Sequence, residues 1–211
     1  MKPEYGPTLG RLLAPRWHAA SALTRRTIGA AAVLLVVAAG ALTLTLLNPA
    51  YSHGGRVPFS FAYGGLFRVS PDPGGYVKVQ KRWHGGALEY SFAVDPLTLG
   101  PYSGELSAVL PLYAASYGAA LERRYTRVVL RGEGATHVNT APAYQVLYTA
   151  LVEGREMYGR DVLLLPEHPG AREGVAIVML TAPGASRQIK GPLEVASTGL
   201  LLHPLKSFVL R

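Results

Sequence analysis

Two apolar runs decide the fold: VAIVML at residues 175–180 and VLLL at residues 162–165. A strand with one solvent-exposed face alternates apolar and polar residues, whereas a strand covered on both faces reads as an unbroken apolar run. We therefore expect Arg160–Leu165 and Val175–Ala182 to be central strands of a sheet that is covered on both sides.

The segments that surround these runs alternate in polarity, which is typical of half-buried antiparallel strands. In residues 87–94, for example, Leu88, Tyr90 and Phe92 share one face. Glycine-rich turns such as 84–86 separate neighbouring segments. Together with the two apolar runs the sequence predicts about seven strands, the alternating ones being 59–63, 76–80, 87–94, 126–133 and 143–152.

Residues 105–124 change to helical spacing, with apolar side chains every three or four positions. Because a proline in a helix interior costs about 3 kcal/mol, we expect the helix either to kink at Pro111 or to begin there. A shorter helix is expected at 193–197. Helices on both faces of a mainly antiparallel sheet give an α+β fold, and we predict this α/β/α sandwich for residues 58–211.

Five short segments of this region carry a family resemblance: FSFAY (59–63), the helix that follows Asp95, NTAPAYQVLY (139–148), GRDVL (159–163) and PLKSF (204–208). In this order of elements the region resembles the Mog1/PsbP-like fold, including its membrane-tethered bacterial versions. The resemblance implies a three-layer sandwich that serves mostly as a binding or assembly module, without shared catalytic residues. Unlike lipoprotein members of the family, this chain has no cysteine to lipidate.

Residues 27–47 read TIGAAAVLLVVAAGALTLTLL, 21 residues without a charged side chain. A helix of this length spans about 31 Å, the hydrocarbon thickness of a bilayer. A core helix would keep a polar face, and a cleaved signal peptide would have a shorter apolar region. We therefore expect an uncleaved transmembrane helix that acts as a signal anchor.

The flanking charges predict the orientation of this helix, because positive residues stay on the cytoplasmic side. Five basic residues precede the apolar stretch, whereas Arg56 is the first to follow it. We therefore expect a single-pass protein of the cell membrane with its N-terminus in the cytoplasm. The predicted organisation is a basic cytoplasmic tail (1–26), the transmembrane helix (27–47), a linker (48–57) and an extracytoplasmic domain (58–211).

The sequence offers no motif for catalysis, for a cofactor or for a metal. The absence of cysteine excludes disulfides and thiol chemistry, and neither a nucleophile elbow nor a phosphate-binding loop occurs. His84, His137 and His168 fall in predicted turns, where a solvated histidine is ordinary. We therefore predict no catalytic, cofactor-binding or metal-binding residues and no cofactor, although three turns can still meet in space.

Basic residues are the strongest polar feature of the chain. The first 47 residues hold five basic side chains and one acidic one, which is half of the chain's net charge of +8. Because this half is explained by membrane topology, the net charge disfavours a nucleic-acid partner. A second group surrounds the end of the predicted helix. It is either the solvated surface of a helix end and an edge strand, or a patch for lipid headgroups or an acidic polymer. The candidate patch consists of Arg123, Arg124, Arg127 and Arg131.

These observations favour a membrane-anchored extracytoplasmic binding or assembly module without catalytic activity. Its expected partners are the lipid bilayer, through the N-terminal helix, and an envelope protein or an anionic surface. Two alternatives remain open at this point. One is an envelope hydrolase whose site forms only in the fold, and the other is a domain that faces the cytoplasm and touches nucleic acid with its basic surface.

Overall fold

The computed structural model describes residues 27, 30–31, 33–37, 40, 49–102, 106–166 and 171–211. The chain divides into two units, Met1–Leu46 and Leu47–Arg211. The predicted cytoplasmic tail and much of the predicted span at 27–47 lie outside the described residues, and the described positions of that span are helical. In the part of the chain that the structure describes, no helix combines the length and the apolar character that crossing a bilayer requires.

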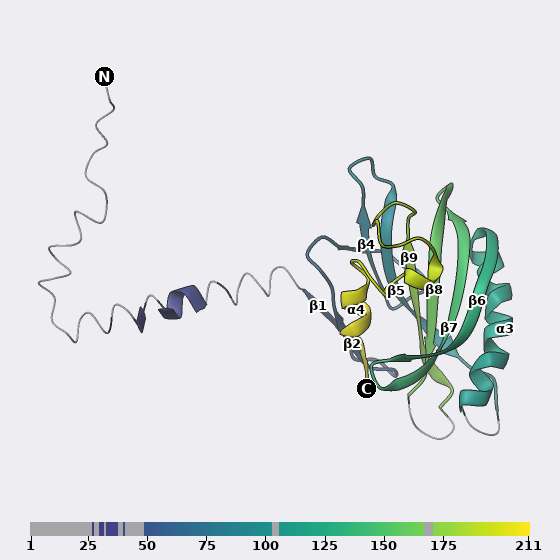
Figure 1. The fold of residues 1–211 in the computed structure, drawn as a ribbon. Coiled ribbons are helices and arrows are strands. Elements are labelled where there is room, and N and C mark those ends of the chain that lie inside the picture. The colour runs from purple at the N-terminus through teal and green to yellow at the C-terminus, as the bar shows by residue number, and fades with distance from the viewer. Residues whose placement is uncertain are drawn as a thin grey trace, which may run out of the picture. The chain divides into compact units, whose positions relative to one another are not determined.

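The second unit is built on a seven-stranded sheet in which every neighbouring pair is antiparallel (Figure 1). Its order is β3-β4-β5-β9-β8-β7-β6. The two apolar runs of the sequence form β8 and β9, and their central position confirms the prediction. The strands are β3 (Arg68–Ser70), β4 (Val77–Arg82), β5 (Leu88–Thr98), β6 (Thr126–Val138), β7 (Ala141–Val152), β8 (Arg155–Leu164) and β9 (Glu173–Thr181).

One face of this sheet is covered by a long helix, α3 (Leu106–Arg124). The helix packs against β6 and β7, and its buried side chains Leu110, Ala114 and Leu121 join those of the sheet in one apolar cluster. Since the helix runs through Pro111, its stable part does not begin at that residue.

The other face is covered mainly by a three-stranded antiparallel sheet in the order β1-β2-β10, where the sequence predicted helices on both faces (Figure 1). Phe59 and Phe61 of this small sheet pack with Phe92 of β5 and with Phe208 in the second apolar cluster. The helical elements on this face of the sheet are short. The elements on this face are β1 (Ala50–His53), β2 (Phe59–Ala62), the 3₁₀ turn η1 (Pro192–Glu194), α4 (Leu202–Lys206) and β10 (Val209–Leu210).

Two boundaries differ from the prediction. The stretch 48–57 was expected to be a linker, but β1 occupies part of it because the ring of Tyr51 packs on Phe59 and Phe61, at centroid distances of 6.0 and 5.8 Å. The adjacent glycines of that stretch therefore lie in a connection between two strands. The helix expected at 193–197 is reduced to the turn η1, and α4 follows it.

A close contact between β7 and β8 matters for the site described below. Gly159 is paired with Tyr148, and the tyrosine ring lies over the glycine. A Cβ atom on Gly159 would come within 2.3 Å of that ring. Position 159 therefore requires glycine, because a side chain there would displace the ring of Tyr148.

Candidate functional site

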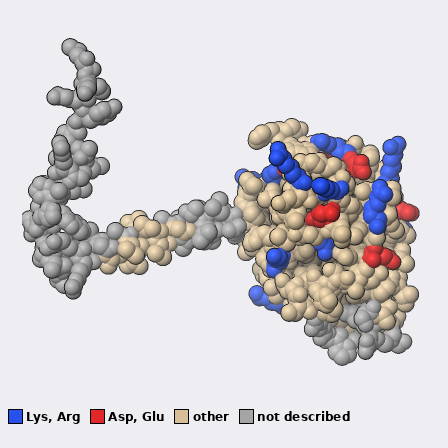
Figure 2. All heavy atoms as spheres, viewed as in Figure 1, with Lys and Arg blue, Asp and Glu red and all other residues tan. Residues whose placement is uncertain are grey.

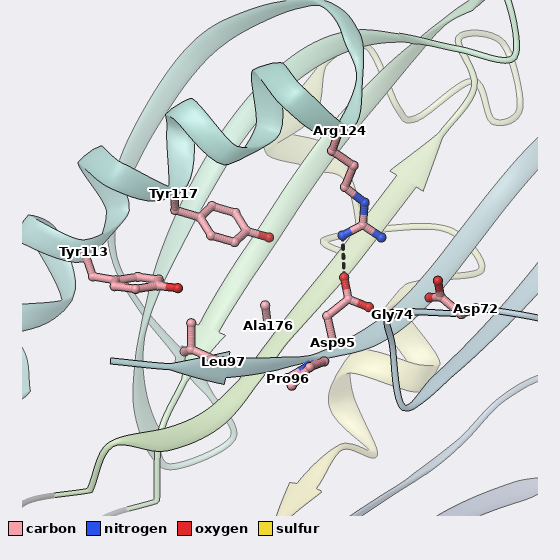
Figure 3. Close-up of a pocket in the computed structure, with 9 residues that line it drawn as sticks. All are labelled: Asp72, Gly74, Asp95, Pro96, Leu97, Tyr113, Tyr117, Arg124 and Ala176. Carbon is pink, nitrogen blue, oxygen red and sulfur yellow. Dashed lines mark hydrogen bonds and ion pairs between the residues drawn. The ribbon is translucent and has the colours of Figure 1, made fainter. Parts of the chain in front are cut away.

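A pocket of about 430 Å³ lies where α3 faces β5, beside the turn that precedes β4 (Figure 3). This volume is within the usual range for small-molecule sites. Side chains from α3 enter it from one side, and those of β5 and the turn enter from the other. The lining residues are Asp72, Gly74, Asp95, Pro96, Leu97, Tyr113, Tyr117, Arg124 and Ala176.

An ion pair in the wall of the pocket joins the end of α3 to β5. The guanidinium of Arg124 donates a hydrogen bond to Oδ2 of Asp95 (Figure 3). The two side chains are 33% and 15% exposed, so the pair is partly removed from water. Such a pair is less screened by salt than a surface pair. It joins the last turn of the helix to the sheet.

Two carboxylate oxygens beside this ion pair have no hydrogen-bond partner among the described residues. They are Oδ1 of Asp95 and Oδ2 of Asp72, and both are buried. Both lie 2.6 Å from the point that a Cβ atom on Gly75 would occupy. The two oxygens are therefore no farther apart than twice that distance, and they pack so closely against Gly75 that a side chain there would clash with them.

Behind the pocket wall lies Asp161, a fully buried carboxyl group on β8. The hydroxyl of Tyr117 donates to its Oδ2 at 2.9 Å, and the hydroxyl of Tyr148 donates to its Oδ1 at 3.0 Å. Burial raises the pKa of Asp161 to about 7, although the two hydroxyl groups and Arg124 act in the opposite direction. Burial also raises the pKa values of both tyrosines well above 10, so both stay protonated as donors.

This arrangement suits binding better than bond cleavage. Asp161 has an exposed fraction of 0%, so a molecule in the pocket would meet the ring of Tyr117 and not the carboxyl group. Asp95 is held by Arg124. The pocket therefore offers fixed charges, an aromatic wall and an apolar floor, which are the parts of a recognition site.

All four arginines of the predicted patch lie at the surface. Arg124 turns into the pocket, and Arg131 donates to the hydroxyl of Thr149 at 3.4 Å. On the face visible in Figure 2, the Lys and Arg side chains are distributed over the surface and do not form one patch.

The histidines that the sequence singled out do not form a site in the described part of the chain. His84 and His137 are exposed, and His168 lies outside the described residues. Among the residues that the structure describes, no group of three or more His, Asp or Glu side chains is placed to hold a metal ion.

The sequence reasoning missed the acidic residues of the site. Asp161 interrupts the predicted central strand GRDVLLL, and Asp95 interrupts the apolar strand SFAVDPL. Charged side chains are rarely buried without a partner. A single acid within a strand that is expected to be covered on both faces was therefore a usable signal for a buried polar contact.

Comparisons with known proteins establish the fold alone. No family model and no curated protein matches the chain. Among solved structures, the chain is similar to cyanobacterial PsbP (CyanoP) from Synechocystis sp. PCC 6803, with a TM-score of 0.52 and 14% identity, over 79% of this chain and 94% of that one. A protein of unknown function from Pseudomonas aeruginosa, PA94, a putative regulator by its description, matches with a TM-score of 0.34 and 16% identity, over 65% of this chain and 84% of that one. The similarity to CyanoP shows that the domain has a PsbP-like fold.

The raised pKa of Asp161 predicts how stability changes with pH. The carboxyl group binds its proton more tightly in the folded state, so the free energy of unfolding should fall as the pH rises from about 4 to about 7 and then level off. Each unit of difference in pKa corresponds to about 1.4 kcal/mol. Asp161→Asn keeps the shape of the group without the titration, so its pH profile should be flatter by about that amount per pH unit.

Urea unfolding of the full chain at several pH values measures this effect. Glu156→Gln supplies the control, since it removes an exposed carboxyl group from the same strand. Parallel profiles for the parent and for Asp161→Asn would show that Asp161 does not titrate in this range.

Proposed function

We propose that this protein is a membrane-tethered, extracytoplasmic binding module and that the pocket between α3 and β5 is its ligand site. The observation that carries the proposal is the pocket itself, where an ion pair, a further aspartate and two tyrosines line a cavity of about 430 Å³. These groups are preorganised, because α3 is fixed to the sheet by the hydroxyl of Tyr117 and by Arg124. Preorganisation lowers the entropy cost of binding.

The sequence supports the membrane tether. Residues 27–47 carry no charged side chain, and the basic residues before them favour a cytoplasmic N-terminus. A tethered module of this kind would present its pocket to ligands or partners at the outer surface of the membrane.

An envelope hydrolase is the second candidate, and one observation favours it. Asp161 has a pKa of about 7, which suits a general acid or base, and Tyr117 connects it to the pocket. We prefer binding because the carboxyl group itself is closed off from the pocket by that tyrosine.

A membrane fractionation tests the tether. The full chain should stay with the membranes after an alkaline carbonate wash, whereas a chain that begins at Pro49 should be released. Protease added to intact spheroplasts should degrade the domain, because we place it outside the cytoplasm. Release of the full chain by the wash would exclude the anchor, and protection from protease would reverse the orientation.

A ligand screen tests the pocket. Saturation-transfer NMR of the full chain with mixtures of small amines, carboxylates and polyols should detect at least one ligand. Tyr113→Ala removes one aromatic wall and should weaken that binding about tenfold, as loss of a well-packed aromatic contact does. Tyr63→Ala is the matched control, because Tyr63 is also a half-buried tyrosine with an aromatic neighbour but lies outside the pocket.

Two results would contradict this proposal. In the first, no compound of any charge class binds. In the second, compounds bind, but the Tyr113→Ala variant loses no more affinity for them than the Tyr63→Ala variant does.

A further inference from the structure

A second group of polar side chains lies on the α3 side of the sheet, toward the other end of the strand order. The helix packs against β6 and β7, whereas these side chains belong to β3, β4 and β5. In one row Arg68 is opposite Gln80, which is in turn opposite Ser91. In the next row Ser70 is opposite Lys78. All five carry N–H or O–H donors, and we call them the donor group.

Two cavities open onto the donor group, and Gln80 lines both of them. The smaller one, of about 70 Å³, is lined by Lys78 and Ser91 together with the C-terminal end of α3. The larger one, of about 300 Å³, is lined by Arg68 and Ser70 on the edge strand β3. The larger volume reaches the lower end of the usual range for small-molecule sites.

Two members of the donor group are almost fully buried and still keep a free donor. Ser91 is 2% exposed, and its hydroxyl has no hydrogen-bond partner among the described residues. Gln80 is 7% exposed. Its Oε1 accepts a hydrogen bond from Arg82 at 3.3 Å, and its amide nitrogen has no partner in the described part of the chain. Buried donors are rarely left unpaired, so an acceptor in these cavities would complete both side chains.

The charges around the cavities indicate the sign of that acceptor. Neither Lys78 nor Arg68 forms an ion pair with a described acid. Of the described residues that line the two cavities, Glu153 alone is acidic. Both of its carboxylate oxygens already accept hydrogen bonds from Arg82, at 2.7 and 2.8 Å. Two positive charges therefore remain without a counter-charge.

We propose that the donor group binds a phosphate group, from a small phosphorylated molecule or from a lipid headgroup. A phosphate monoester carries about two negative charges at neutral pH and three strong acceptor oxygens. This charge matches the two free cations, Arg68 and Lys78, and the oxygens match the buried donors between them. A carboxylate would neutralise only one of the two cations. Arginine and lysine are both common phosphate ligands in proteins.

This site is separate from the pocket between α3 and β5, so the inference goes beyond the proposed function. Arg124 lines both that pocket and the smaller cavity. Its guanidinium is already paired with Asp95, and its charge is therefore not one of the two free cations.

The experiment titrates the full chain, in a maltoside detergent and a phosphate-free buffer, with inorganic phosphate and follows the amide signals by ¹⁵N NMR. Phosphate should shift the signals of the donor group, and acetate should bind more weakly because it carries a single charge. Lys78→Gln and Arg68→Gln should each weaken phosphate binding about tenfold, as loss of one hydrogen bond to a charged group does. Ser91→Ala should also weaken it, without any change of charge.

Exposed residues of the same kinds supply the matched controls. Lys190→Gln and Arg187→Gln each remove one positive charge between β9 and η1, outside both cavities. They should leave phosphate binding unchanged. Tyr113→Ala should also leave it unchanged, because Tyr113 lines the other pocket.

A second arm identifies the source of the phosphate group. Glycerol 3-phosphate and dioleoylphosphatidic acid, the latter added to the same micelles, both carry a phosphate monoester. Tighter binding of the lipid points to a headgroup at the membrane surface, and tighter binding of glycerol 3-phosphate points to a soluble ligand. Both results support a phosphate site.

The proposal is overturned if inorganic phosphate does not bind or if acetate binds as tightly. It is also overturned if Lys78→Gln and Arg68→Gln bind phosphate as well as Lys190→Gln and Arg187→Gln do. These results would leave the pocket between α3 and β5 standing, because that pocket is tested by the effect of Tyr113→Ala on its own ligands.

Discussion

The structure depends on one buried polar contact, in which the carboxyl group of Asp161 accepts hydrogen bonds from the hydroxyls of Tyr117 and Tyr148. A buried carboxyl group is costly unless its oxygens are satisfied. One hydroxyl comes from the helix and the other from the neighbouring strand, so the contact fixes the position of α3 over the sheet. Apolar packing alone would hold the helix on this face but would restrict its rotation less.

The pocket follows from that fixed position. Residues three, four and seven places apart lie on the same face of a helix. Once Tyr117 points at Asp161, Tyr113 must lie one turn before it and Arg124 two turns after it, both toward the sheet. Asp95 on β5 then meets Arg124, and the turn with Asp72 closes the far side. The same contact thus serves stability and recognition, and the absence of a side chain on Gly159 is what lets Tyr148 take part in it.

Much of the fold could be predicted from the sequence. The alternating segments and the two apolar runs located all seven predicted strands, because the pattern of apolar residues along a strand shows which of its side chains are buried. The strands β1, β3 and β10 were missed. They have two to four residues each, which is too short for a periodic signal. The helix predicted at 193–197 was wrong for the same reason, since that segment is also too short for a periodic signal.

The site was less accessible to sequence reasoning. Four arginines close together in sequence predicted a patch, but nothing in that pattern showed that Arg124 pairs with Asp95, 29 residues away, and lines the pocket. The two acidic residues that line the pocket come from a turn and from β5, and Asp161 behind the wall comes from β8, so their approach depends on strand order. The single acid within a buried strand was the one local sign of Asp161.

The pKa of Asp161 is the most direct measure of this account, since it reports that the carboxyl group is buried beneath α3 and engaged by two hydroxyls. A ¹³C NMR titration of the side-chain carboxyl carbons in the folded chain, assigned with Asp161→Asn, measures it. The account predicts a midpoint near 7 for Asp161. A midpoint near 4, the ordinary value for a solvated aspartate, would mean that water reaches the group and that α3 is not fixed to the sheet in this way.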